Sequence, residues 1–296
     1  MEKIVLNVMT EKGFEVLKSV ILIHKEILAF VVIGKDSNIE NDFSDEIAKL
    51  CELNSLQYFF RGREPSADKN HYIFAISWRW MIKHPSNKLI VFHDSLLPKY
   101  RGFAPLVNML INGEKQIGVS AILGASEYDK GDIIEQKSTS ITYPLKIADA
   151  VKINNNNFLA LVEILLKKIS KSNKIIATPQ SELNASYSIW RDFDDYYIDW
   201  SQSASEIKRL IDAVGSPYLG ARSRISNGDE IVIEDAEVVA DVYCELRHIG
   251  KVIFVEDEKP IIVCGSGLLK LTKASILKGD FFEDFLPLKS FRLRFK

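Results

Sequence analysis

The chain has 296 residues, 47% of them apolar, which is enough for one large domain and a smaller second one, each with its own core. Its 38 Lys and Arg face 40 Asp and Glu, and the formal net charge is -2. This balance excludes the global basic excess that drives counterion-release binding to nucleic acid. A large nucleic-acid partner is therefore disfavoured.

The three cysteines are Cys51, Cys244 and Cys264, and they show neither a metal-ligand spacing nor a CxxC pair. An odd number of isolated cysteines favours reduced, buried thiols and a cytoplasmic protein without a metal site. Glu2 and Lys3 lead straight into a short apolar stretch, and no apolar run is long enough to span a membrane. The sequence therefore predicts a soluble protein with no membrane partner.

The first half of the chain predicts alternating strands and helices. Apolar runs bounded by turn residues predict strands at 4–8, 27–33, 58–60, 72–76, 89–92 and 118–123. Apolar residues at helical spacing predict helices around 14–21 and at 42–53, 105–112 and 147–169, the last with Asn154 to Asn157 facing solvent. Such alternation predicts a mostly parallel sheet with helices on both faces.

The rest of the chain follows a different pattern. Residues 170–204 lack a clear period and predict a linker, 204–214 predict a helix, and short β-type runs follow at 231–233, 252–255, 261–263 and 268–271. Short strands at that spacing favour a small barrel or sandwich, with 291–295 as an edge strand or capping segment. We expect a large α/β domain over 1–180, a connecting segment with a helix over 181–215, and a small β domain over 216–296.

Polar residues follow two of the predicted strands. His93 comes directly after the strand 89–92, where open α/β sheets bind their ligands, and Asp129 stands in an Asp-x-Gly turn that can project a carboxylate toward the same edge. A base that titrates near neutral pH, with a carboxylate to orient it, is what acyl transfer to an amine requires. Each residue alone also has an ordinary structural explanation, as a strand-end histidine and as a turn former.

The segment that begins at His93 closely resembles the core signature of the formyltetrahydrofolate-dependent formyltransferases, which include the methionyl-tRNA and nucleotide-sugar enzymes. It reads His93-x-Ser95-Leu96-Leu97-Pro98-x-Tyr100-Arg101-Gly102-x-x-Pro105, followed by Gly113-Glu114, Gly118-Val119-Ser120 and Asp129-x-Gly131-Asp132-Ile133. Farther on, Ile198-Asp199-Trp200 and Pro217-Tyr218-x-Gly220-Ala221 resemble the connecting segment of the sugar-modifying members, and Cys264-Gly265-x-Gly267-Leu268-Leu269 resembles the C-terminal β domain. The likeness covers nearly the whole chain and is strongest between 89 and 136.

The resemblance implies a Rossmann-like N-terminal domain that binds 10-formyltetrahydrofolate and a small OB-like C-terminal domain. It implies that His93 is the general base for the acceptor amine and that Asp129 holds the ring. The loop of Ser95, Leu96, Leu97 and Pro98 is implied to line the folate pocket. Trp78 and Arg79 lie in the segment that walls this pocket in relatives, although the aromatic residues there could equally be core residues.

One position departs from the family pattern. The resemblance implies an Asn two residues before the catalytic His, whereas this chain has Val91, and valine cannot donate a hydrogen bond to an oxyanion. The loss of such a donor costs about 10²–10³ in rate unless another donor replaces it. Candidate replacements are protonated His93 itself, a backbone N–H in the loop after it, or a side chain of the 77–80 segment.

The function that we expect is N-formylation of an amino sugar carried on a nucleotide such as dTDP or UDP. The candidates to bind this acceptor are Arg101, Gly102, Tyr187, Trp190, Arg191 and Tyr218. Aromatic and cationic side chains suit a base and a diphosphate, although these aromatics could instead pack the linker onto its domain.

Two other functions stay open. One is methionyl-tRNA formylation, against which the acidic stretch 229–258 argues because a tRNA surface would be basic. The other is a non-catalytic protein that binds folate or a sugar nucleotide and has lost its activity through Val91. The aromatic residues of the linker and the second domain could also supply a homodimer interface.

Overall fold

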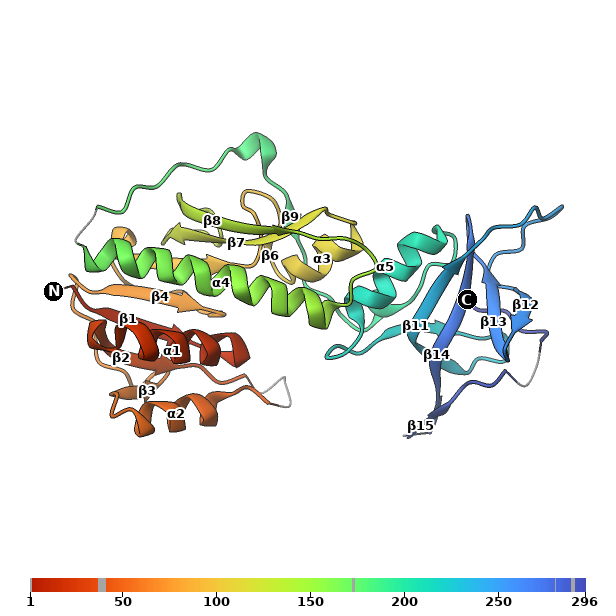
Figure 1. The fold of residues 1–296 in the computed structure, drawn as a ribbon, viewed down its shortest axis with the longest axis horizontal. Coiled ribbons are helices and arrows are strands. Elements are labelled where there is room, and N and C mark those ends of the chain that lie inside the picture. The colour runs from red at the N-terminus through yellow and green to blue at the C-terminus, as the bar shows by residue number, and fades with distance from the viewer. Residues whose placement is uncertain (1, 37–40, 172–173, 280, 289–290) are drawn as a thin grey trace. The chain divides into compact units, whose positions relative to one another are not determined.

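The computed structural model describes residues 2–36, 41–171, 174–279, 281–288 and 291–296, which form two compact units (Figure 1). The first unit comprises Met1–Gly102, Ile117–Thr139 and Ile153–Ser188, and the second comprises Phe103–Gln116, Ser140–Lys152 and Ile189–Lys296. The units therefore interleave along the chain, whereas the predicted division into 1–180, 181–215 and 216–296 is consecutive.

The first unit is built on a seven-stranded sheet with the strand order β3-β2-β1-β4-β5-β7-β8. Its strands are β1 (Ile4–Val8), β2 (Leu28–Ile33), β3 (Tyr58–Phe60), β4 (Tyr72–Ile76), β5 (Leu89–His93), β7 (Gln116–Leu123) and β8 (Ile133–Ser140). Strands β1 to β5 are parallel, and β7 runs antiparallel to β5. The predicted α/β fold with a mostly parallel sheet is confirmed, and β8 is a strand that the sequence did not predict.

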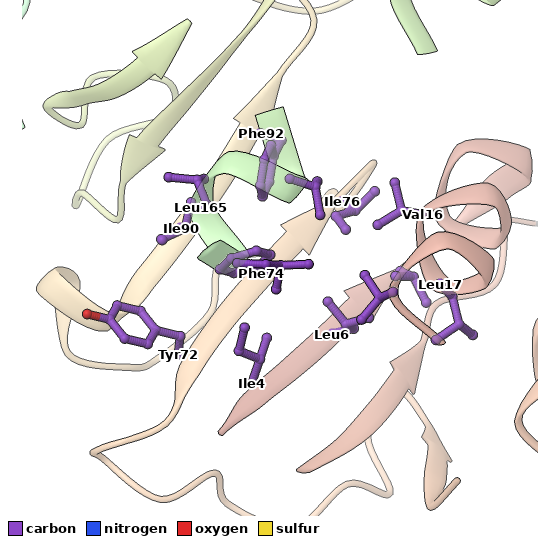
Figure 2. Close-up of a cluster of buried hydrophobic side chains, with 14 of the residues drawn as sticks. Ile4, Leu6, Val16, Leu17, Tyr72, Phe74, Ile76, Ile90, Phe92 and Leu165 are labelled. Carbon is purple, nitrogen blue, oxygen red and sulfur yellow. The ribbon is translucent and has the colours of Figure 1, made fainter. Parts of the chain in front are cut away.

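Helices cover one face of this sheet. They are α1 (Thr10–His24), α2 (Ser44–Leu53) and α4 (Ile147–Ser170), and all three contribute side chains to one buried cluster. Figure 2 shows Leu6 and Phe74 of the sheet close to Leu17 of α1 and Leu165 of α4. Because side chains alternate along a strand, every second residue of β1 enters this cluster and the others face the opposite side of the sheet.

Loops cover the opposite face. The described cluster there is formed mainly by strand residues, among them Val5, Phe30 and Ile73. Its members from outside the strands are Ala67, Trp78 and Ile82, which lie in loops. No helix contributes to this cluster as described, so the predicted cover of helices on both faces is wrong for this face. The physical reason is the short connection between β3 and β4, where only residues 61–71 are available to cross the sheet.

Helix α4 buries two of the asparagines that the sequence predicted to face solvent. Asn154 is 1% exposed and Asn157 is also buried. Asn157 Oδ1 accepts from Thr139 Oγ1 at 2.8 Å, and Asn154 Nδ2 donates to Asp94 Oδ1 at 3.3 Å. Polar side chains are buried where they find partners, and these partners come from distant parts of the sequence. In the part of the chain that the structure describes, α4 and the other helices lack the apolar length needed to cross a membrane.

The second unit contains an antiparallel sheet with the order β10-β11-β14-β13-β12, in which β15 also pairs with β14. Its elements are α3 (Pro105–Ile111), α5 (Ala204–Val214), β10 (Ala221–Arg224), β11 (Glu230–Val239), β12 (Val252–Glu256), β13 (Lys259–Val263), β14 (Leu268–Lys278) and β15 (Phe281–Asp284). The C-terminal segment bridges both edges, since Phe295 pairs with Ile225 and Arg294 pairs with Lys251. The segment 291–295 thus joins both edges of the sheet, which favours the barrel over the sandwich that the sequence left open.

The cysteines differ in their environments. Cys51 and Cys264 are buried, and burial raises the pKa of each thiol to about 12. Cys244 is partly exposed, so the expectation that all three thiols are buried is wrong for this residue.

Two leucines of α1 test the account of the core. Leu17 is fully buried, and Leu22 on the same helix is 78% exposed. Leu17→Ala should lower the free energy of unfolding by about 2–5 kcal/mol, because it removes buried methyl groups and leaves a cavity. Leu22→Ala, the matched control, should change it by less than about 0.5 kcal/mol. Urea unfolding of both variants measures this, and equal losses would contradict the assigned core.

Candidate active site

His93 is the last residue of β5 and is 8% exposed. Its Nε2 lies 2.8 Å from the carbonyl oxygen of Tyr100, and its Nδ1 lies 3.3 Å from Asp129 Oδ1. A carbonyl oxygen can only accept, so the ring proton is fixed on Nε2, which donates. Nδ1 is therefore the nitrogen that can gain or lose a proton, and it faces the carboxylate.

Asp129 is held by the backbone on its other side. Its Oδ2 accepts a hydrogen bond of 2.8 Å from the Gly102 N–H, while Oδ1 faces His93. Gly102 has φ +101, and a Cβ there would lie 2.5 Å from the carbonyl oxygen of Ser188. Only glycine fits this close approach, which explains its place in the His93 segment.

The route by which Asp129 reaches His93 differs from the prediction. Strand β7 is antiparallel to β5, so its last residue, Leu123, pairs with Ile90 instead of His93. Residues 124–131 must then return along the sheet edge, and Gly131 makes this possible. A Cβ on Gly131 would lie 1.7 Å from the Leu123 carbonyl oxygen. The Gly of the Asp-x-Gly pattern is therefore required because the chain passes so close to the end of β7 at this turn.

The loop after His93 is locked by hydrogen bonds. Ser95 Oγ donates to the Lys99 carbonyl oxygen at 2.7 Å, and the Ser95 carbonyl accepts from Ser120 Oγ at 2.6 Å. The Leu97 N–H donates to Ser120 Oγ at 3.0 Å, and Gln136 Nε2 donates to the Leu97 carbonyl at 2.9 Å. Ser95 is fully buried, so its hydroxyl serves this loop. The loop is a rigid support for the residues on either side of it.

A cavity of about 80 Å³ lies beside the pair. Its lining includes the aromatic residues Trp78 and Trp80, together with Met81, Val91 and Asp129. The Trp78 Nε1 is buried and has no hydrogen-bond partner among the described residues. Aromatic and apolar walls with a carboxylate at one end suit a flat heteroaromatic ligand with a polar edge.

Other predicted folate residues lie apart from this cavity. The described lining does not include Ser95, Leu96, Leu97 or Pro98, of which Leu96 and Pro98 are partly exposed. The lining as described also omits Arg79, whose guanidinium pairs with Asp36. Contact of these residues with folate stays a prediction, and Trp78 is the predicted residue that the structure brings beside Val91 and Asp129.

The residues predicted to bind an acceptor divide between the two units. Arg101, Gly102 and Tyr187 belong to the first unit. Arg101 is 1% exposed, and its guanidinium bonds to Gln180, Glu182 and the Tyr187 hydroxyl. A contact between this guanidinium and an acceptor would require it to leave these partners.

The remaining candidates belong to the second unit. Trp190 and Tyr218 are 59% and 44% exposed. Arg191 Nη2 donates to Asn108 Oδ1 at 2.9 Å, and its Nη1 donates to the Asp195 carbonyl at 3.2 Å. Their role in binding an acceptor stays a prediction.

Sequence reasoning missed two groups of this site. The Tyr100 carbonyl, which fixes the His93 ring proton, carries no side-chain signal. Gln180 stands in a stretch without period, and its amide donates to the carbonyls of Asp129 and Gly131. Its distance along the chain from Asp129 left nothing in the sequence to connect the two. The described residues contain no group of three or more His, Cys, Asp or Glu placed to hold a metal ion.

A histidine and a carboxylate in contact at the end of a central strand, beside an apolar cavity, define a site suited to acid–base chemistry on a bound ligand. Two family models match the chain: Formyl transferase over residues 76–156, and Formyl transferase, C-terminal domain, over residues 192–281. Together they cover more than half of the sequence. The chain belongs to the formyl transferase family.

Curated relatives include the methionyl-tRNA formyltransferases of Borreliella burgdorferi (strain ZS7) and Borrelia hermsii (strain HS1 / DAH). They are 34% and 32% identical over 180 residues, which is 60% of this chain and 56% and 57% of the two relatives. The chain thus matches little more than half the length of these relatives.

Solved structures with the same fold include a sugar 3N-formyl transferase crystallised with dTDP and 5-N-formyl-THF, at 20% identity and a TM-score of 0.69. An N-formyltransferase from Helicobacter canadensis has 18% identity and a TM-score of 0.70. Each match covers 92% of this chain and 99% of the other. These likenesses confirm the two-part fold.

Gly131 tests the tight return of the Asp129 turn. Gly131→Ala should lower the free energy of unfolding by at least about 2 kcal/mol, because its Cβ meets a backbone carbonyl that cannot rotate away. Gly62→Ala is the control: Gly62 has φ +86, which Gly131 does not share, and the space around it is open. It should cost about 1 kcal/mol, from the backbone conformation alone. Urea denaturation measures both, and equal costs would contradict the steric argument.

Proposed function

We propose that this protein is an N-formyltransferase that moves a formyl group from 10-formyltetrahydrofolate to the primary amine of a nucleotide-linked amino sugar. The observation that carries the proposal is the contact between His93 Nδ1 and Asp129, which lies at the end of β5 in a chain of the formyl transferase family. An amine becomes a nucleophile when it loses a proton, and this pair is placed to take one.

His93 and Asp129 have different roles in the proposed transfer. The amine nitrogen attacks the formyl carbon and becomes positively charged, and His93 Nδ1 accepts the proton that it releases. Asp129, 3.3 Å from Nδ1, stabilises the positive charge as it moves from the amine to the ring. The same Nδ1 proton then passes to the folate nitrogen as its bond to the formyl carbon breaks. Proton transfer by a placed side chain contributes about 10²–10⁴ to the rate.

The cavity beside Asp129 supports 10-formyltetrahydrofolate as the co-substrate. Its walls include two tryptophans, Trp78 and Trp80, whose ring centroids lie 5.2 Å apart, with Met81 and Val91 completing an apolar lining. A pteridine ring is flat and aromatic, so it would pack against such walls, and the carboxylate would accept from its polar edge.

The oxyanion needs a donor, because Val91 stands where relatives of the family have Asn. The Trp78 indole N–H is the candidate with structural support, since it is buried, has no hydrogen-bond partner in the described part of the chain, and belongs to a side chain that lines the same cavity as Val91 and Asp129. An unmet buried donor costs about 1–3 kcal/mol, which a ligand oxygen can recover. We assign the oxyanion contact to this N–H. Protonated His93 has no second N–H for it, because Nε2 donates to the Tyr100 carbonyl and Nδ1 faces Asp129.

Charge supports a small acceptor over tRNA. Residues 216–296 contain 12 Lys and Arg against 13 Asp and Glu. Several of these cations are already paired within the unit, as in Lys278 with Asp229 at 2.6 Å and Arg247 with Asp241 at 3.1 Å. A surface that neutralises tRNA phosphates needs a basic excess. Methionyl-tRNA is nevertheless the second candidate, because the curated relatives named above are methionyl-tRNA formyltransferases.

A transfer assay with 10-formyltetrahydrofolate tests the function. The acceptors are a panel of dTDP- and UDP-linked 3-amino and 4-amino sugars and, separately, methionyl-tRNA. We expect turnover with an amino sugar, and a loss of about 10³ or more in kcat for His93→Ala and for Asp129→Asn. His248→Ala and Asp45→Asn, which change exposed residues, should retain wild-type rates.

The outcomes separate the candidate functions. If only methionyl-tRNA is formylated, the proposed amino-sugar acceptor is wrong and the protein is a methionyl-tRNA formyltransferase. Folate binding without turnover on either acceptor would contradict transfer and favour the non-catalytic alternative that Val91 raises.

The oxyanion donor has its own test. Trp78→Phe keeps an aromatic wall and removes the N–H, so kcat should fall by about 10²–10³ while folate affinity changes less than about threefold. Adding Val91→Asn to that variant should raise its kcat at least about tenfold, because asparagine supplies a side-chain amide at the position where the resemblance implies one. Val91→Leu is the matched control and should restore nothing. A Trp78→Phe variant with wild-type kcat would assign the oxyanion to another group.

A further inference from the structure

A second set of residues surrounds the catalytic pair without touching the reacting groups. Arg101 lies directly before Gly102, whose N–H holds the Asp129 carboxylate. The Arg101 guanidinium is fully buried and makes two parallel hydrogen bonds to Glu182, of 3.0 and 2.9 Å. These bonds hold the pKa of the Glu182 carboxyl below its usual range. Because the Arg101 guanidinium is buried and held in place, its two bonds to the exposed Glu182 side chain hold the segment that carries Glu182 against the site.

Gln180 connects this arginine to the catalytic turn. Its Oε1 accepts from Arg101 Nε at 3.0 Å and from Nη2 at 2.8 Å. Its Nε2 donates to the carbonyl oxygens of Asp129 and Gly131, both at 2.7 Å. All four hydrogen-bonding positions of the amide are therefore used. Its orientation is also determined, because a flipped amide would place N–H groups against the guanidinium and its oxygen against two carbonyls.

The turn needs such support. Asp129 has φ +57, a left-handed conformation that costs a residue with a side chain about 1–2 kcal/mol. Gln180 binds the carbonyl on each side of Lys130, so it holds both ends of the strained turn. The side chain and the backbone of Asp129 are thus fixed by neighbouring groups, Gly102 for the carboxylate and Gln180 for the carbonyl.

The segment that supplies Gln180 is anchored at both ends. Thr178 exchanges two hydrogen bonds of 2.8 Å with Ile133 at the start of β8. At the other end, β9 (Tyr187–Ser188) pairs with β6 (Arg101–Gly102) in parallel. Residues 178–188 therefore span the outside of the site from one strand of its framework to another.

On the basis of the proposed function, we infer that Gln180 is a positioning residue for the acid–base pair. It sets the place of the Asp129 carboxylate relative to His93 Nδ1, and Arg101 with Glu182 sets the place of Gln180. The segment 178–188 belongs to the active centre although it supplies no reacting group.

Two substitutions at this position and one control form the kinetic test. Gln180→Leu removes every hydrogen bond of the amide. Gln180→Glu keeps an oxygen that can accept from the Arg101 guanidinium but replaces the N–H donors by a carboxylate oxygen that faces two carbonyls. Gln57→Glu adds the same charge at an exposed glutamine of the same unit.

We expect kcat at pH 8 to fall by about 10²-fold in both Gln180 variants, since small misplacements of a catalytic group cost rates of that order, with KM for folate changed less than about threefold. The ratio of kcat in Gln180→Glu to wild type should stay low between pH 8 and pH 5, because the Arg101 guanidinium favours the ionised carboxylate, which cannot donate to the two carbonyls. The ratio for Gln180→Leu should stay flat. Taking the ratio to wild type at each pH removes the pH effects that the variant and the wild-type protein share.

A second readout does not depend on activity. The Gly102 N–H donates to Asp129 Oδ2, so its hydrogen exchange, followed by NMR, reports the place of the carboxylate. Exchange should be at least about tenfold faster in Gln180→Leu and unchanged in Gln57→Glu.

Unchanged Gly102 exchange in Gln180→Leu would overturn the inference. Wild-type kcat in both Gln180 variants would also overturn it, even with a lowered melting temperature, because that pattern belongs to a structural residue. If wild-type protein transfers formyl to no acceptor, the proposed function fails, and Gly102 exchange still decides whether Gln180 positions Asp129.

Discussion

The carboxylate of Asp129 is the group on which the site depends, because it joins segments that are far apart in the chain. One oxygen accepts from the Gly102 N–H and the other faces His93 Nδ1. The ring in turn donates from Nε2 to the Tyr100 carbonyl. With Nε2 committed to the Tyr100 carbonyl, Nδ1 is the nitrogen left to exchange a proton, and it lies beside a carboxylate that stabilises a positive charge on it.

The two faces of the sheet contribute differently to the site around Asp129 and His93. Helices α1, α2 and α4 give the sheet a dense core on one face, which fixes the end of β5 and with it His93 (Figure 2). The other face is covered by loops, and the loop with Trp78 and Trp80 leaves a cavity that reaches Asp129. A rigid sheet with one loop-covered face provides both a fixed base and room for a ligand.

The features that could be predicted from the sequence are those that depend on local residue patterns. Strands β1 to β5, strand β7 and helix α5 follow from apolar spacing. His93 and Asp129 were identified from a strand end and a tight turn together with the resemblance to the family. The antiparallel course of β7, the burial of Asn154 and Asn157, and the role of Gln180 were missed. Each depends on a partner from another part of the chain, which no spacing rule contains. Arg101 was predicted to bind an acceptor, yet its burial by Gln180 and Glu182 shows how a motif residue can serve the framework.

The most direct measurement of the central claim is the ¹⁵N NMR spectrum of the His93 ring as a function of pH, assigned by comparison with His93→Ala. Nε2 should keep its proton throughout, because the Tyr100 carbonyl holds it, and only Nδ1 should change its protonation. Asp129→Asn should alter the Nδ1 signal and leave Nε2 unchanged. A neutral ring with its proton on Nδ1 would contradict the account, since Asp129 would then face a donor and Nδ1 could not serve as the base.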